Sequence, residues 1–317
     1  MGYALSAVNK LLFPLAGAVS TIFVARVIDR IGKGMRDAPR DAFMTDVTPA
    51  PIRGSGFGLR LTFYTTGFVI GLLAAIGLMR LSGDDFRLVF WIAVIPAVLA
   101  IVVLMVALKE SPKRPSSGAP RLRMRRSEIA RFAPAFWWAI AIASLLSLAR
   151  FSQAFLVLKA HHIGIDAAFV PIMLVLMHVV YAIAAYPFGV LADRIDRRWQ
   201  LGAGAVALIG ADLVLAGADE AWMTALGAAC WGLQMAVTQG LLSATVADAA
   251  PENMRATAFG IYEMAVGLST FIASTAAGAL WMVGGPGLTF GVSGCIAAVS
   301  VLLLLLWPMP KTIGVPS

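Results

Sequence analysis

Charged side chains are scarce in this chain, and their scarcity excludes a water-soluble domain. Only 13% of the residues are Asp, Glu, Lys or Arg, whereas 60% are hydrophobic, and the mean hydropathy is +0.84. A soluble fold needs more polar side chains to cover its surface. Cysteine is rarer still: Cys230 and Cys295 both lie in apolar stretches, so we expect neither a disulfide nor a metal site. No cofactor is expected either.

Long apolar runs are what the sequence does contain. Runs of about 20 residues, enough to cross a bilayer as a helix, recur along the whole chain. They lack the alternating pattern of a membrane β-strand, so we expect an all-α integral membrane protein. The sequence predicts about ten transmembrane helices, near residues 2–18, 19–38, 56–80, 86–108, 133–158, 168–191, 199–217, 221–246, 258–283 and 287–308.

Residues 109–131 differ from the other connections because they are polar, basic and rich in Pro and Ser. We expect a cytoplasmic linker here, between an N-terminal half at 1–108 and a six-helix bundle at 132–317. Lys and Arg are also concentrated in the other loops on that side, which predicts a multi-pass protein of the plasma or inner membrane with both termini cytoplasmic. This topology, with basic loops against anionic lipid, accounts for the net charge of +8, so nucleic acid is not an expected partner.

An internal repeat appears when the chain is compared with itself at an offset of 202 residues. MTDVTPAPIRGSGFG at 44–58 aligns with VADAAPENMRATAFG at 246–260. Five of the fifteen aligned positions are identical, all at nontrivial residue types, so the match exceeds chance. Both copies fall in loops on the basic side, which predicts two halves of the same orientation, one of the known transporter architectures. The identities are Asp46 with Asp248, Pro49 with Pro251, Arg53 with Arg255, Phe57 with Phe259 and Gly58 with Gly260.

GVLADRIDRR at 189–198 resembles the cytoplasmic loop signature G-x-L-A-D-R-x-x-R-R of the major facilitator superfamily. That family carries the loop between its second and third helices and again, more weakly, between its eighth and ninth. Because a repeat copy follows at 246–260, the resemblance assigns this loop to the second half. The chain then resembles helices three to twelve of a twelve-helix transporter, N-terminally truncated, in a fold of two bundles with four and six helices.

Charges at the ends of the helices on the basic side are expected to form a cytoplasmic gate. Asp193 and the arginines near it lie at one helix end, and Asp248 closes another, so we expect an ion pair between the arginine cluster and Asp248 that latches one conformation shut. The alternative is that these are solvated loop charges of little energetic value. By the repeat, Asp46 is expected to lack the arginine cluster that would match the partner of Asp248, because that cluster would lie in the missing upstream segment. The gate candidates are Asp46, Arg53, Gly189, Asp193, Arg194, Arg197, Arg198, Asp248 and Arg255.

Ionisable and polar side chains inside the apolar runs are costly to insert, so each is a site hypothesis. ARVIDRIG at 25–32 resembles the family's fourth-helix pattern and starts a charged stripe. His178 and Glu263 are candidates for proton coupling, because an imidazole or a tuned carboxylate can change charge near neutral pH. Each has a simpler reading as a hydrogen-bond or ion-pair partner of a neighbouring helix. The candidates for the solute cavity are Arg26, Asp29, Arg30, Arg150, Gln153 and Gln234.

The resemblance implies a secondary active transporter that moves a small organic solute, such as a drug, a metabolite or a sugar. Alternating access, coupling to protons, a monomeric state and contact with membrane lipids are expected with it. The alternative is a non-transporting remnant or mis-started fragment of such a protein. A membrane-embedded enzyme would need a cluster such as His-Glu-x-x-His or paired intramembrane Asp residues, and the sequence has neither, so no enzyme is expected.

Overall fold

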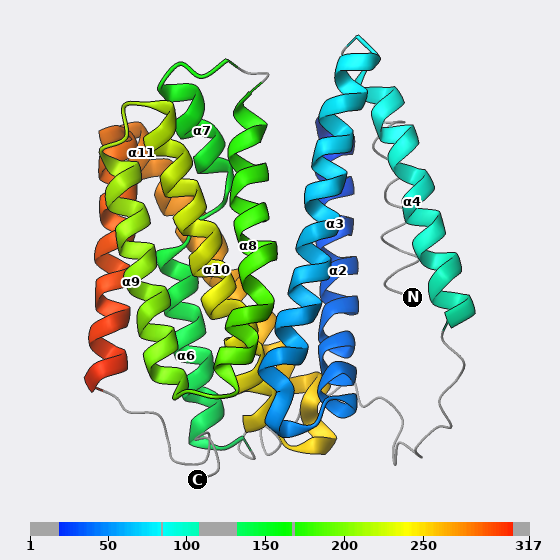
Figure 1. The fold of residues 1–317 in the computed structure, drawn as a ribbon, viewed down its shortest axis with the longest axis vertical. Coiled ribbons are helices and arrows are strands. Elements are labelled where there is room, and N and C mark those ends of the chain that lie inside the picture. The colour runs from blue at the N-terminus through cyan, green and yellow to red at the C-terminus, as the bar shows by residue number, and fades with distance from the viewer. Residues whose placement is uncertain (1–18, 84, 108–131, 167–168, 307–317) are drawn as a thin grey trace. The chain divides into compact units, whose positions relative to one another are not determined.

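The computed structural model describes residues 19–83, 85–107, 132–166 and 169–306, and within these ranges the regular elements are helices (Figure 1). The expected span at 2–18 and the expected linker at 109–131 lie outside the described residues. The α-helices are α2 (Val19–Val47), α3 (Arg53–Leu81), α4 (Phe86–Ala107), α6 (Pro134–Ala149), α7 (Ala154–His162), α8 (Val170–Ala192), α9 (Arg197–Ala216), α10 (Ala221–Ala249) and α11 (Arg255–Leu306), and the 3₁₀ helices are η1 (Ala50–Ile52) and η2 (Glu252–Met254).

The all-α membrane fold expected from the sequence is confirmed. Five segments within the described ranges are long and apolar enough to cross a membrane: 50–81, 134–162, 170–192, 197–216 and 252–306. The last of these holds two of the expected spans. They are joined at Gly285, whose backbone is far from helical, with φ at 66° and ψ at −161°. Glycine tolerates this conformation because it has no Cβ, and Pro286 follows it.

The described residues divide into two compact units: those up to residue 40 and from 73 to 107 form one, and those from 41 to 72 and from 132 to 306 form the other. In the first unit, helix α4 begins after Asp85, whose Oδ1 accepts hydrogen bonds from the backbone N–H groups of Arg87 and Leu88 at 2.9 and 3.1 Å. Large apolar side chains then point outward along α4, including Ile95, which is 59% exposed. An apolar exterior of this kind is suited to lipid rather than water.

Helix α10 lies at the centre of the second unit, packed against α8 and α9, while α11 packs against α6 and α9. Almost every residue of α10 between Trp231 and Val246 is buried. α10 is less apolar than the five membrane-spanning candidates above, because amide and hydroxyl side chains recur along it. A helix that is polar and buried in a membrane protein must satisfy those groups against neighbouring helices.

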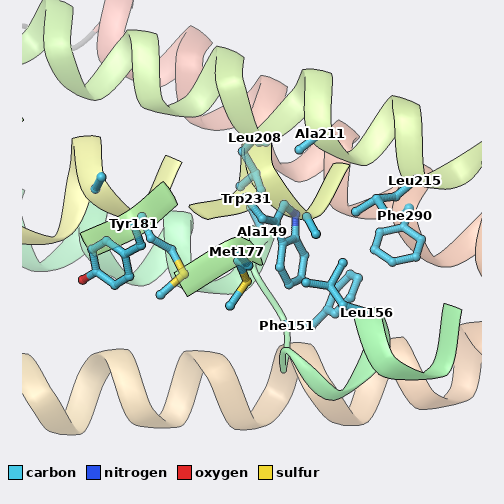
Figure 2. Packing of buried hydrophobic residues seen from close by; sticks show 14 of the residues in the cluster. Ala149, Phe151, Leu156, Met177, Tyr181, Leu208, Ala211, Leu215, Trp231 and Phe290 are labelled. Carbon is cyan, nitrogen blue, oxygen red and sulfur yellow. The ribbon is translucent and has the colours of Figure 1, made fainter. Parts of the chain in front are cut away.

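The apolar core of the second unit forms where α6, α7 and α8 meet α9, α10 and α11 (Figure 2). Phe151 contacts Trp231 and Phe290, with ring centroids 5.4 and 5.3 Å apart. All three side chains are at most 5% exposed. This aromatic cluster fixes the place at which α6 ends and α7 begins, between residues 150 and 153.

Candidate functional site

The two copies of the sequence repeat fold in the same way. In each copy a helix ends, a proline follows, one turn of 3₁₀ helix forms, and a new helix starts at an arginine. Pro49 has φ and ψ of −55° and 143°, and Pro251 has −57° and 141°. Arg53 and Arg255 then open α3 and α11. The self-alignment at an offset of 202 residues therefore identified a genuine structural repeat.

The acidic and basic residues of the two copies pair with each other reciprocally. Arg53 of the first copy donates to Asp248 of the second, and Arg255 of the second donates to Asp46 of the first. Arg197, at the start of α9, adds a bond to Asp248, with Nη2 and Oδ2 2.6 Å apart. We call these five residues the latch.

An aromatic contact shows that the pairing is symmetric. Phe57 and Phe259, which occupy equivalent positions in the two copies, contact each other with ring centroids 6.0 Å apart, and both are at most 1% exposed. When a residue touches its own equivalent, a local two-fold axis passes close to the contact. The two reciprocal ion pairs of the latch therefore lie in equivalent positions around this ring pair, and Arg197 adds to one of them.

Asp193 has a different role from the latch carboxylates, because it caps the first turn of α3. Its Oδ1 accepts from the backbone N–H of Gly54 at 2.7 Å, and its Oδ2 accepts from Ser55 N at 2.8 Å and from Ser55 Oγ at 2.5 Å. The first N–H groups of a helix have no partner within the helix, and the positive end of the helix dipole favours a carboxylate there. Asp193 thus ties the end of α8 to the start of α3.

Glycines let α3 and α8 approach closely beside this cap. A Cβ at Gly54 would lie 2.6 Å from the Gly189 carbonyl oxygen, and one at Gly58 would lie 2.7 Å from the Ala185 carbonyl oxygen. A Cβ at Gly189 would meet Gly54 O at 2.5 Å. Two glycines four residues apart on one helix are a known means of close helix packing in membranes. The N-terminal turns of α3 are therefore in backbone contact with α8.

The candidates for the cytoplasmic gate differ in what their side chains contact. The ion pair with Asp248 is made by Arg197 of the cluster; Arg194 is exposed, and no bond from the Arg198 side chain is found within the described residues. Asp46 pairs instead with Arg255 of the second copy, a partner that the sequence analysis did not predict. Gly54 and Ser55 were not predicted, although an Arg-Gly-Ser opening to a helix could have indicated a capped start.

A second polar group lies at the break between α6 and α7. Arg150, half-buried, directs Nη1 to Gln234 Oε1 at 3.5 Å. In the one orientation of the Gln239 amide that satisfies both neighbours, its oxygen accepts from the Arg150 Nη1 and Nη2 atoms at 3.0 and 3.1 Å, and its nitrogen donates to Tyr181 Oη at 2.9 Å. Gln234 also donates to Thr238 Oγ1 at 3.2 Å. We call Arg150, Tyr181, Gln234 and Gln239 the polar cluster.

The polar cluster contains two of the expected cavity residues and two that sequence reasoning missed. Gln153 lies nearby and donates to the sulfur of Met235 at 3.8 Å. Gln239 and Tyr181 were missed; a glutamine five residues after Gln234 in an apolar run was the available signal. Arg26, Asp29 and Arg30 belong to α2, but their side chains lie outside the described residues.

The two expected proton-coupling residues lie on α8 and α11. His178 is buried in α8, where its Nδ1 lies 2.8 Å from the Leu174 carbonyl oxygen and its ring stacks on Phe68 at 4.1 Å between centroids. Glu263 lies half-buried on α11. In the part of the chain that the structure describes, no three His, Cys, Asp or Glu side chains gather as a metal site.

The apolar helices, the repeated latch and the broken helix with its polar cluster define a multi-pass α-helical membrane protein of transporter type. The family model described as Major Facilitator Superfamily matches residues 1–160 and 140–317. The chain belongs to the major facilitator superfamily.

Similar proteins agree with this assignment. The chain is 31% identical over 311 residues to an uncharacterized MFS-type transporter of Methanocaldococcus jannaschii, covering 96% of this chain and 76% of the relative. It is 25% identical over 279 residues to an uncharacterized protein of Mycobacterium tuberculosis, covering 85% of this chain and 66% of that protein.

Solved structures have the same fold. The human organic anion transporter MFSD10 superposes with a TM-score of 0.80 at 16% identity, over 96% of this chain and 75% of that one. The Escherichia coli fucose:proton symporter FucP superposes with a TM-score of 0.71 at 18% identity, over 96% and 82%. At these identities the likeness supports the fold alone.

Proposed function

We propose that this chain works as a secondary active transporter that moves a small organic solute by alternating access, coupled to protons. The observation that carries the proposal is the reciprocal pairing of Arg53 with Asp248 and of Arg255 with Asp46. Alternating access requires contacts that close one side of the protein and can later separate. Ion pairs that join the two copies of a repeat meet this requirement.

The energetics of the latch suit a reversible closure. Its carboxylates keep some contact with solvent, with Asp248 19% exposed and Asp46 54% exposed. Because water reaches these carboxylates, the ion pairs stabilise the closed state less than fully buried pairs would. The backbone contact between α3 and α8 adds packing without any covalent link. We propose that the latch closes the cytoplasmic side and opens when solute or protons shift the balance.

The polar cluster is the proposed binding site for the solute. In the described residues, no carboxylate lies within ion-pair distance of Arg150, whose guanidinium meets only amide oxygens. An arginine held in this way keeps its positive charge available for a ligand, and its planar fork suits carboxylates and other acceptor groups. We therefore propose a solute that carries an anionic group or several hydroxyls. Two proteins of the same fold are described as an organic anion transporter and a fucose:proton symporter.

Uptake into proteoliposomes tests the proposal. Vesicles containing the 317-residue chain would be given radiolabelled sugars and small organic anions, with and without a pH gradient. We expect at least one solute to accumulate above the level of empty vesicles, and faster with the gradient. Arg150→Ala should reduce that uptake at least tenfold, and Arg150→Lys less, because the charge stays but the fork is lost.

Arg194→Ala is the matched control, since Arg194 is exposed and forms no bond to the described residues. Its uptake should equal that of the unmodified chain. The absence of transport for every solute, with correctly inserted protein, would favour the non-transporting alternative. Equal transport by the Arg150→Ala variant would contradict the binding site.

A further inference from the structure

Asp212 is a buried carboxyl group that belongs to neither the latch nor the polar cluster. It lies on α9 with 0% exposure. Its Oδ1 accepts from Trp231 Nε1 of α10 at 3.0 Å, and its Oδ2 lies 2.6 Å from Ser293 Oγ of α11. Within the described residues it forms no ion pair with Arg, Lys or His. An ionised carboxylate in such a place would be strongly disfavoured.

The hydrogen bonds around Ser293 decide the protonation state of Asp212. Ser293 Oγ also contacts the carbonyl oxygen of Ala149, the last residue of α6. That carbonyl can only accept, and it belongs to a helix end whose carbonyls lack donors within the helix. A hydroxyl has one hydrogen, so if Ser293 donates it to Ala149, the hydrogen between Ser293 and Asp212 must come from Asp212.

We propose that Asp212 is a proton-binding site, held as a neutral carboxylic acid in this conformation. Its O–H donates to Ser293 Oγ, Ser293 donates to the Ala149 carbonyl, and the remaining carboxyl oxygen accepts from Trp231. In this arrangement each atom has a suitable partner. Loss of the proton would leave two acceptors facing one hydroxyl hydrogen, and Ser293 would turn from Ala149 to the carboxylate.

The surroundings of Asp212 keep water and competing charges away. The elements packed against α9 are α10 and α11, and the groups they present to the carboxyl are the Trp231 indole and the Ser293 hydroxyl, both uncharged. Phe151 packs against the Trp231 indole, with ring centroids 5.4 Å apart, and both belong to the apolar core drawn in Figure 2. The charged residue nearest along this chain of contacts is Arg150, which follows Ala149 and faces the amides of the polar cluster.

Through these contacts, the protonation state of Asp212 affects Arg150 in the proposed solute site. Ala149 ends α6, and Arg150 is the next residue, in extended backbone with φ at −118° and ψ at 96°. When Ser293 releases Ala149, the end of α6 loses a tether to α11, and Arg150 becomes freer to move. The inference rests on the proposed function in this one respect: the proton on Asp212 is the one that couples to the solute at Arg150.

Infrared difference spectroscopy tests the protonation without needing any solute. The reconstituted full chain at neutral pH should show the carbonyl stretch of a protonated carboxylic acid, and Asp212→Asn should remove it. Asparagine keeps an acceptor for Trp231 and a donor for Ser293, so this variant should fold. Asp46→Asn, at the exposed latch carboxylate, is the control and should retain the band. Ser293→Ala should move the band, because the acid loses its partner.

Absence of the band at neutral pH, or its persistence in Asp212→Asn, would overturn the protonation. The coupling is tested separately, with a solute that the unmodified chain transports. Asp212→Asn should keep solute exchange at equal pH and lose at least tenfold of the acceleration by a pH gradient. An unchanged acceleration would overturn the coupling while leaving the transport proposal intact, and a chain that transports nothing would still give the infrared result.

Discussion

The two carboxylates of the latch are equivalent in the repeat but not in their surroundings. Asp248 binds two arginines, Arg53 and Arg197, and its side chain is 19% exposed. Asp46 binds Arg255, which also lies 3.9 Å from Glu252, and its side chain is 54% exposed. The sequence repeat alone would assign them equal roles.

The difference comes from the junction of α8 and α9. Arg197, the first residue of α9, binds Asp248, and Asp193, at the end of α8, caps the start of α3, so one side of the symmetric pair gains a second cation and a helix cap. Equivalent residues can thus carry unequal shares of a closure. The latch should depend mainly on Asp248, less on the glycine contact, and least on Asp46.

Asp248→Asn should have the largest effect on the closed state. It leaves Arg53 and Arg197 without a carboxylate, and both side chains are only 10–11% exposed. Arg53 Nε and Arg197 Nη1 already lack partners in the described region. We expect a loss of about 2 to 3 kcal/mol of closure free energy, below the value for a fully buried pair because some solvent reaches the site.

Spin labels at Ile52→Cys and Asn253→Cys, both exposed positions, can report the closure in a background without Cys230 and Cys295. Electron–electron distance measurements should give one short distance for the labelled parent and a second, longer population in the Asp248→Asn variant. A single unchanged distance would show that packing alone holds this end closed.

Gly58→Ala should have an intermediate effect. The added methyl group would lie 2.7 Å from the Ala185 carbonyl oxygen and 3.0 Å from Gly189 Cα, both backbone atoms that cannot turn aside. Overpacking of this kind costs about 1 to 3 kcal/mol. Gly67→Ala on the same helix is the control, since nothing lies within 4 Å of its added Cβ. The same spin labels should separate in the first variant and not in the second; equal behaviour would mean that the glycines are not needed for the contact.

Asp46→Asn should have the smallest effect. More than half of this side chain is exposed, so water replaces much of what the ion pair supplied, and Arg255 keeps Glu252 nearby. We expect less than about 1 kcal/mol, and hence little change in the distance between the labels. An effect as large as that of Asp248→Asn would show that the two halves of the latch act equally despite their different exposure.

Much of the fold could be predicted from the sequence because hydropathy and length decide it directly. Helix positions, the all-α class and the repeat each follow from patterns along the chain. The reciprocal pairing could not be predicted in the same way. Aligning Asp46 with Asp248 shows that they are equivalent, but contact between Asp46 and Arg255 depends on how the two copies meet in space.

The polar cluster was only partly predictable for a related reason. Arg150 and Gln234 were recognised because charged and amide groups stand out in apolar runs. The end of α6 at Ala149 was not foreseen, since the run from 133 to 158 reads as one continuous helix. The break depends on the aromatic cluster around Phe151 and on Ser293, more than 140 residues away. Likewise, Asp193 could be recognised as part of a charged loop, but its role as the cap of α3 depends on how α8 and α3 meet in space.

The contact between Phe57 and Phe259 also bears on how the two copies of the repeat could diverge. A residue far from the local axis can change in one copy without affecting its equivalent. A residue on the axis packs against its own counterpart, so a change in either copy alters the surroundings of both. The identities at Asp, Arg and Phe fall at these mutual contacts, where independent drift of one copy is penalised by the other. The sequence similarity between the two copies is therefore retained at the positions where the copies contact each other.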